Sequence, residues 1–148
     1  MAKSRRLQVL EAVIALVKEA LPFADVKGLD ADDAKPDFIG PGGLVVVRSG
    51  DPGEPDVDLS PLTYNYEHLI PLEVAAYETA DKTSEQVLDE MMIAIGEAAQ
   101  ADTSLGGLCQ WLEARAPNTD DFETVGAVAG RWADFAVVAH YATSNPLN

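Results

Sequence analysis

The sequence is poor in cysteine and in basic residues, and it lacks any long apolar run. Its single cysteine, Cys109, excludes an internal disulfide, and no CxxC pair is present to bind zinc. No stretch approaches the ~20 apolar residues that a membrane-spanning helix needs. Lys and Arg total 10 against 25 Asp and Glu, a formal net charge of −15. Because that charge repels phosphates and anionic lipid, we expect neither sequence-specific nucleic acid nor a membrane among the partners.

The N-terminal segment is amphipathic and does not resemble a secretory signal. Glu11, Lys18 and Glu19 interrupt its apolar residues, which recur at helical spacing from Lys3 to Leu21. The helix is predicted to end before Pro22, because the proline ring disfavours helical geometry in the preceding residue. We therefore expect a protein that stays in the cytoplasm of the cell that makes it.

Apolar runs and a second amphipathic pattern give the expected element order of helix, three strands, helix, two strands. The second helix begins at Thr83, which has capping-box spacing to Gln86, and Gly106 and Gly107 follow it. Pro71 places the third strand near an edge or a bulge. The expected strands are Leu44–Arg48, Leu62–Glu67, Ile70–Ala76, Leu108–Ala116 and Arg131–Thr143.

These elements predict one α+β domain spanning residues 1–148. Its mainly antiparallel sheet has four to five strands, with the two amphipathic helices packed on one face. The segments Asp25–Gly43, Asp51–Pro61 and Pro117–Gly126 are rich in turn residues and are predicted to be loops. The expected core between helices and sheet comprises Leu10, Ile14, Val17, Leu72, Val74, Met91 and Ile95.

Two acidic segments invite a test for calcium binding. The first carries Asp51, Glu54, Asp56 and Asp58, whose spacing is interrupted by prolines. The second, Asp30–Pro41, begins like a calcium loop but has lysine and proline where glycine and glutamate are required. We therefore predict solvated acidic loops, with no metal and no other cofactor.

Cys109 and the two histidines, His68 and His140, allow a thiol and base pair, so a small cysteine-dependent enzyme is one alternative. The simpler interpretation makes Cys109 a small buried residue of a strand. It also makes the histidines partly exposed residues near strand ends. On this interpretation the protein is not an enzyme.

Three segments carry a resemblance to a known family. They are the acidic turn of "VVVRSGDPGEP", the histidine that enters the apolar run of "YNYEHLIPLEVAAYE", and a closing V-x-Y-x-T-like pattern in "FAVVAHYATSNP". Val138, Tyr141 and Thr143 carry the last pattern, one residue out of strict register. Together with the two helices, this order of elements resembles the tail terminator (tail completion) proteins of long-tailed bacteriophages and prophages over nearly the whole chain.

The resemblance implies a structural virion protein without catalytic activity. Such a protein forms a hexameric ring that caps the tail tube at its neck end, stops tail polymerisation and prepares the tail for joining to the head. Its expected partners are further copies of itself, the tail tube protein and the head–tail connector protein. It would be found in the host cytoplasm during assembly and then in the virion tail. A head–tail connector (neck) protein or a tail tube subunit is the alternative, since these share the α+β layout.

The acidic segment and the tyrosines after it are the candidate interface or channel residues. They are Asp51, Glu54, Asp56, Asp58, Tyr64 and Tyr66. Six copies with a charge of −15 each would surround a channel through which DNA slides without sticking. We expect Asp51–Pro61 to be a mobile segment that orders on assembly. We also expect Tyr64, Tyr66 and Val138 to need a partner or some other protection, because they lie on the open face or edges of the sheet.

Overall fold

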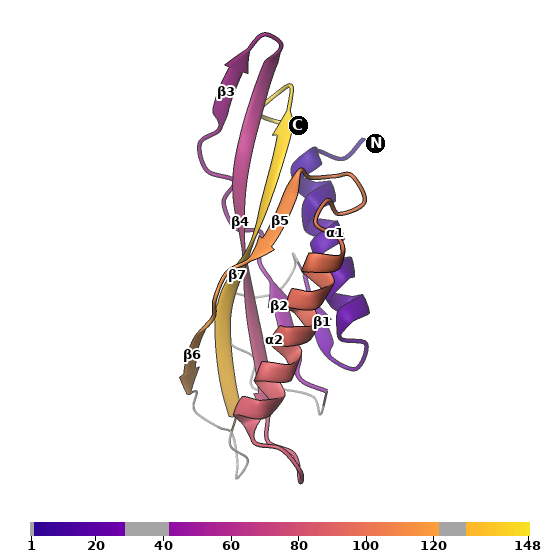
Figure 1. Ribbon diagram of the computed structural model, residues 1–148, viewed down its shortest axis with the longest axis vertical. Helices are drawn as coiled ribbons and strands as arrows, with labels where there is room; N and C mark the ends of the chain where they lie inside the picture. The colour runs from indigo at the N-terminus through magenta and orange to yellow at the C-terminus, as the bar shows by residue number, and fades with distance from the viewer. Residues whose placement is uncertain (1, 29–41, 122–129) are drawn as a thin grey trace.

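The computed structural model describes residues 2–28, 42–121 and 130–148. In chain order the described elements are α1 (Arg5–Ala20), β1 (Asp25–Lys27), β2 (Leu44–Val47), β3 (Asp56–Leu59), β4 (Leu62–Tyr77), α2 (Ser84–Ala101), β5 (Trp111–Ala114), β6 (Asn118–Asp121) and β7 (Gly130–Thr143). Figure 1 shows an elongated molecule with the sheet on one side and the two helices on the other.

The described strands form one mixed, mostly antiparallel sheet. Its main path is β1-β2-β4-β7-β5, while β3 pairs with β4 and β6 pairs with β7. The long strands β4 and β7 pair from Tyr64 and Thr143 at one end to Tyr77 and Gly130 at the other. Only β1 and β2 run parallel among the described pairs. The α+β class is confirmed, and β1, β3 and β6 are strands that the sequence does not predict.

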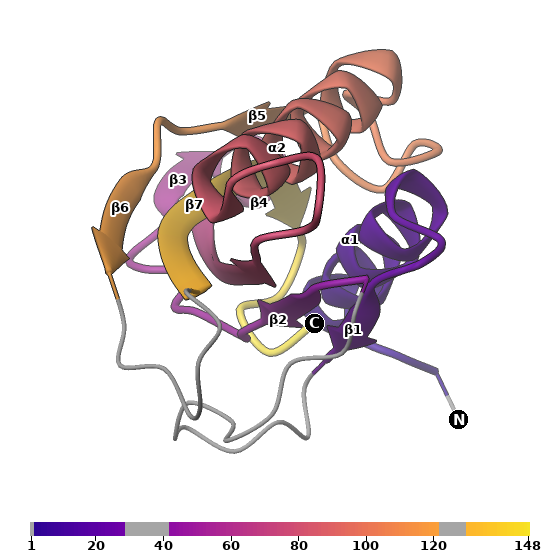
Figure 2. The same ribbon diagram turned by 90° about the horizontal axis from the view of Figure 1, so that it is seen from below.

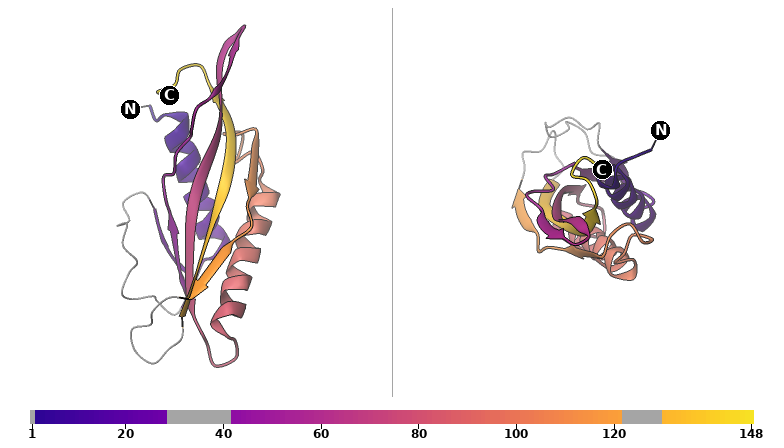
Figure 3. Two further views of the ribbon diagram at one scale, coloured as in Figure 1. Left: turned by 90° about the vertical axis from the view of Figure 1, so that its left-hand side faces the viewer. Right: turned by 90° about the horizontal axis from the view of Figure 1, so that it is seen from above.

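Both helices pack on one face of the sheet, as predicted. Helix α2 contacts β4, β5 and β7, while α1 contacts α2 and β1. The left panel of Figure 3 looks onto the sheet, with both helices behind it. Seen along the long axis in Figure 2, the sheet curves so that α1 and α2 lie on its inner side.

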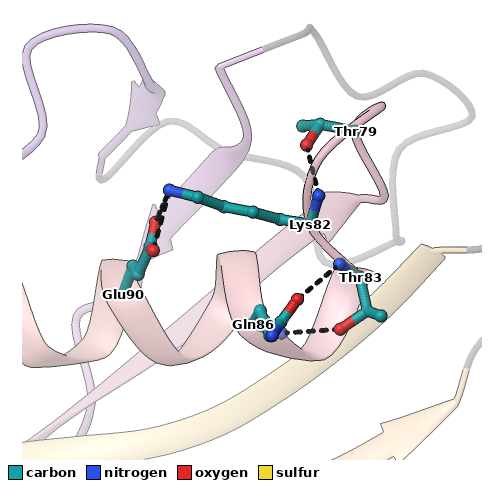
Figure 4. Close-up of polar contacts among 5 residues, drawn as sticks. All are labelled: Thr79, Lys82, Thr83, Gln86 and Glu90. Atoms are coloured by element: carbon teal, nitrogen blue, oxygen red, sulfur yellow. Dashed lines mark hydrogen bonds and ion pairs between the residues drawn. The ribbon is translucent and has the colours of Figure 1, made fainter.

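Each helix begins at a residue whose side chain caps its first turn. The Ser4 hydroxyl accepts a hydrogen bond from the backbone N–H of Leu7 at the start of α1. At the start of α2, Thr83 and Gln86 form the predicted capping box, drawn in Figure 4. Lys82, just before this cap, forms an ion pair with Glu90 in the second turn of the helix. These local bonds satisfy N–H groups that have no partner within a helix.

The main core lies between the helices and alternate residues of the long strands. Ile70, Leu72 and Val74 of β4 are fully buried, because side chains two residues apart share one face. Six of the seven predicted core residues are buried: Leu10, Val17, Leu72, Val74, Met91 and Ile95. Ile14 is partly buried. A Cβ atom placed on Gly28 would lie 2.8 Å from its Cδ1, so Ile14 packs on the backbone beyond β1.

The face of the sheet away from the helices carries a second, smaller apolar cluster. It comprises Leu44, Val46, Ala75 and Trp132, with Tyr77 packed beside them. These positions alternate with main-core residues of the same strands, which places them on the opposite face. Val138, on this face of β7, is also fully buried. The expectation that Val138 is an uncovered residue is therefore wrong.

The two strands expected at Leu62–Glu67 and Ile70–Ala76 are one continuous strand, β4. Pro71 lies within it, just past the end of β2, whose last pair joins Val47 to Leu72. The Pro71 carbonyl accepts a hydrogen bond from the Arg48 N–H, so its nitrogen also faces the β2 side. The missing N–H of proline removes only the reciprocal bond to the Arg48 carbonyl, at the point where β2 ends.

Three short strands lie in segments expected to be loops. β1 follows α1 directly, β3 forms much of the acidic segment, and β6 lies in the turn-rich stretch before β7. The expected mobile loop Asp51–Pro61 thus contains a paired strand, which corrects that expectation. Each of these strands is short and joins the sheet through one neighbour among the described strands.

Candidate assembly surface

Strand β3 and the first residues of β4 form a hairpin that projects beyond the ends of both helices (Figure 1). Its register runs from the Asp56–Asn65 pair to the Leu59–Leu62 pair at the tip. The Asn65 amide donates hydrogen bonds to the Asp56 carbonyl and the Asp58 carboxylate, at 3.2 and 3.1 Å. Among the described strands β3 pairs only with β4, so its outer edge presents unpaired backbone groups.

One face of the hairpin is apolar, and we call it the apolar stripe. Val57 pairs with Tyr64, and Leu59 pairs with Leu62, so all four side chains lie on one face. It is the face that the helices cover further along β4, because side chains alternate along a strand. Leu59 is 83% exposed and Leu62 is 48% exposed. Clustered exposed apolar side chains of this kind mark an interaction surface.

The opposite face of the hairpin carries acidic side chains. Asp56 and Asp58 are exposed and face away from the apolar stripe. Glu54, just before β3, is exposed as well. The hairpin is therefore an amphipathic finger with an apolar side and an anionic side.

The acidic segment is anchored where it begins. Arg48 forms an ion pair with Glu73 of β4 at 2.8 Å. Gly50 has a φ of 64°, and a Cβ atom there would lie 1.9 Å from the Leu69 carbonyl oxygen. A side chain at this position would therefore displace the segment from β4. Asp51 then bridges to Leu69 and accepts a hydrogen bond from the Gly53 N–H.

His68 lies beneath this anchored segment and is fully buried in β4, which corrects the expectation of a partly exposed strand-end residue. Its Nε2 donates to the Ser49 carbonyl at 2.6 Å, because a carbonyl oxygen can only accept. Its Nδ1 therefore accepts from the Tyr141 hydroxyl at 2.9 Å. Burial lowers the pKa of His68, against the opposing effect of the Ser49 carbonyl. His68 is thus a neutral structural link between the Ser49 segment and β7.

A cavity of about 170 Å³ lies at the base of the hairpin, and we call it the terminal cavity. Its lining comes from the start of α1, the segment before β3, the two long strands and the C-terminal segment: Ser4, Arg6, Pro52, Tyr66, Tyr141, Pro146 and Leu147. The rings of Tyr66 and Tyr141 lie 5.7 Å apart between centroids. Burial raises the pKa of Tyr141 to about 12, so its hydroxyl stays protonated and available to His68.

Arg6 gives the terminal cavity its cationic group. Its side chain is exposed, and it forms no hydrogen bond or ion pair within the part of the chain that the structure describes. The basic residues next to it in sequence differ, since Lys3 pairs with Glu11 and Arg5 donates to the Leu108 carbonyl. An available guanidinium is notable on a chain with a net charge of −15.

The structure brings together part of the predicted candidate set. Asp56, Asp58 and the half-buried Tyr64 all belong to the hairpin. Asp51 lies at its anchored base. Tyr66 is only 7% exposed and belongs to the core, so it reaches the surface only as part of the cavity lining.

Sequence reasoning did not single out the residues that complete this surface. They are Val57, Leu59, Leu62 and Arg6. The segment "DVDLSPLTY" contains the missed pattern, since Val57 and Leu59 alternate with aspartates and a Ser-Pro turn separates them from Leu62. Arg6 had no comparable pattern, because its position beside Tyr141 depends on how α1 packs.

The alternative thiol and base pair is not assembled. The Cys109 thiol, in the segment just before β5, donates to the Thr103 carbonyl at 3.4 Å. Burial raises the pKa of Cys109, which disfavours the thiolate. His68 is occupied by Ser49 and Tyr141, and His140 lies 3.8 Å from Glu67.

No group of three or more potential metal ligands was found in the described ranges. The acidic segment Asp30–Pro41 lies outside the described residues, so this statement does not cover it. Neither α1 nor α2 is long and apolar enough to cross a membrane.

Comparison with known proteins gives no family assignment. No protein-family profile matches the chain, and no curated protein matches it.

Proposed function

We propose that this protein is a tail terminator of a long-tailed bacteriophage or prophage. In this role six copies form a ring on the neck end of the tail tube, end tube polymerisation and receive the head–tail connector. The proposal places the chain in the host cytoplasm during assembly and in the virion tail afterwards. Two independent lines support it: the resemblance in element order and motifs, and the presence of a surface suited to assembly.

The observation that carries the proposal is the projecting hairpin. Leu59 and Leu62 are exposed on an arm with an unpaired strand edge. A protein that acts alone gains nothing from such a surface, which favours aggregation unless a partner covers it. The hairpin therefore favours an assembly protein over a small monomeric enzyme.

The strong negative charge also supports a ring around DNA. Six copies at −15 each surround a channel that repels the phosphate backbone, so DNA passes without being held. The same repulsion acts between copies and opposes ring closure in dilute, low-salt solution. Free protein is therefore expected to be monomeric at low concentration and to assemble at higher salt or on the tube end.

Imaging of particles assembled without this protein tests the proposal. Loss of a tail terminator leaves tube polymerisation unchecked, so tails longer than normal are expected. Restoring the protein should return tails to one length and place the chain at the neck end of purified tails. Tails of normal length that stay unjoined to heads would instead support the connector alternative. Absence of the chain from the neck end of purified tails would contradict the terminator role.

A further inference from the structure

We propose that the β3–β4 hairpin of one copy docks into the terminal cavity of a second copy. Leu59 enters the cavity, and the acidic side of the hairpin pairs with Arg6. The inference rests on the self-assembly part of the proposed function, and it names the two surfaces that meet.

The cavity and the hairpin tip match in size. An apolar protein cavity of about 150 Å³ holds a benzene-sized group. The terminal cavity, at about 170 Å³, therefore accepts one leucine-sized side chain. The rings of Tyr66 and Tyr141 are part of its lining and offer apolar contact to Leu59.

The charges of the two surfaces are complementary. The hairpin presents Asp56 and Asp58 on the face opposite Leu59, while the cavity presents the available guanidinium of Arg6. Asp58 uses one carboxylate oxygen to accept from Asn65, which leaves further acceptor positions for an arginine. Pairing across the contact would also offset part of the repulsion between two acidic copies.

The hairpin of the same chain does not fill its own cavity. Leu62 at the tip is four residues along β4 from Tyr66 in the cavity lining, a distance of roughly 13 Å in an extended strand. Figure 1 shows the tip pointing away from the body of the molecule. The finger of one copy is therefore available to bind a neighbouring copy. The cavity of the same copy stays open to the finger of a different copy.

This contact joins two different surfaces. A reciprocal exchange would close it as a two-fold dimer, and the form we propose is one-way, head to tail. Every copy donates one finger and receives one, and such a contact closes into a ring or continues as a filament. A direct hairpin-to-hairpin contact would instead be symmetric and would stop at a dimer. Cross-linking between chosen positions distinguishes a finger-to-cavity contact from a hairpin-to-hairpin contact.

The test uses cysteine cross-linking between two single variants in a Cys109→Ala background. Ser4→Cys places a thiol in the cavity lining, and Leu59→Cys places one at the hairpin tip. With a short bismaleimide, a mixture of the two variants should give covalent dimers, whereas each variant alone should give far fewer. A chain carrying both changes should give a ladder of covalent oligomers. Circular dichroism checks that each variant is folded.

Several results would overturn the inference. Cross-linking of Leu59→Cys alone would show a symmetric hairpin contact. An exclusively intramolecular product from the double variant would show that the finger reaches its own cavity. A lack of cross-links at every concentration and salt, or cross-links only to another protein of purified tails, would rule out a second copy as occupant.

Charge reversal provides a second measurement. Arg6→Glu and Asp58→Arg should each weaken self-association about tenfold or more, because each removes a charge-assisted contact. The double variant should recover a large part of the loss. Lys18→Glu, the same charge change at another exposed position of α1, should leave association close to that of the unmodified chain. Additive losses in the double variant would contradict the Arg6–Asp58 pairing.

The outcomes of this test and of tail imaging are separable. Overlong tails in the absence of the protein, combined with no Ser4–Leu59 cross-link, would support the terminator role and reject this interface. A clear cross-link with tails unaffected would keep the interface and reject the terminator role.

Discussion

The two halves of β4 belong to one strand but lie in different surroundings. From Ile70 to Ala76 the strand has β2 and β7 beside it and α2 across one face, and its apolar residues are buried. From Leu62 to Tyr64 the same face continues past the helices, and its apolar residues are partly or largely exposed. Alternation therefore identifies the face of a strand, whereas neighbouring elements decide whether that face is covered.

The largest expected effect comes from the same substitution in each half of the strand. Leu72→Ala should lower the free energy of unfolding by about 2–5 kcal/mol, because it opens a cavity in the main core. Leu62→Ala should change it by no more than about 0.5 kcal/mol. Urea denaturation of both variants at pH 7.5 measures the difference. Similar losses would show that the hairpin is packed against the body in solution.

The boundary between the two halves is at His68, and its removal should have an intermediate effect. His68→Leu leaves the Tyr141 hydroxyl and the Ser49 carbonyl without their partner. At pH 7.5 the expected loss is about 1–3 kcal/mol. Urea denaturation measures this loss, with His140→Gln as a control that leaves the buried link intact.

His68 also predicts a pH dependence. Its pKa in the folded state is lowered from 6.5, so the unfolded chain binds the proton more readily. Stability from this group is complete above pH 6.5 and decreases as pH falls toward the lowered pKa. The unfolding free energy of the unmodified chain should therefore decline from pH 7 to pH 5.5. His68→Leu should show a flatter profile over that range, and an unchanged slope would contradict the role of His68.

The smallest expected effect on stability tests whether exposure alone explains why substitutions in the two halves of β4 should differ. Thr83 is exposed, like the hairpin tip, but its hydroxyl caps α2. Thr83→Ala should cost about 1 kcal/mol, and Thr83→Ser should cost little because serine retains the cap. Thermal denaturation of the pair measures this difference. Equal stabilities would show that the capping box contributes nothing in solution.

The parts of the fold predicted correctly are those with a strong period of their own. Helices α1 and α2 follow 3.6-residue patterns and a capping box, and β2 and β7 are dense in β-branched and aromatic residues. β4 was predicted as two strands, Leu62–Glu67 and Ile70–Ala76, with Pro71 inside the second and placing it near an edge or a bulge. Pro71 lies just past the last β2 pair, and that position depends on a pairing register that sequence does not show.

The short strands β1, β3 and β6 were missed for a different reason. β6 consists of Asn, Thr and Asp, and half of β3 is Asp, residues that are typical of turns. They are extended because a long neighbouring strand offers them backbone partners. The candidate surface was predicted in part for the same reason: its aspartates were visible as charges, whereas the exposure of Leu59 and the position of Arg6 required the packed chain.

The link through His68 has a mechanical consequence for the finger. Its imidazole ties the Ser49 segment to Tyr141 on β7, while Arg48 ties the same segment to Glu73 on β4. The base of the finger is therefore held by both of the longest described strands, while its tip projects freely. Because its base is already fixed, the finger loses little conformational entropy when its tip binds. A small contact at Leu59 is then enough to hold a neighbouring copy.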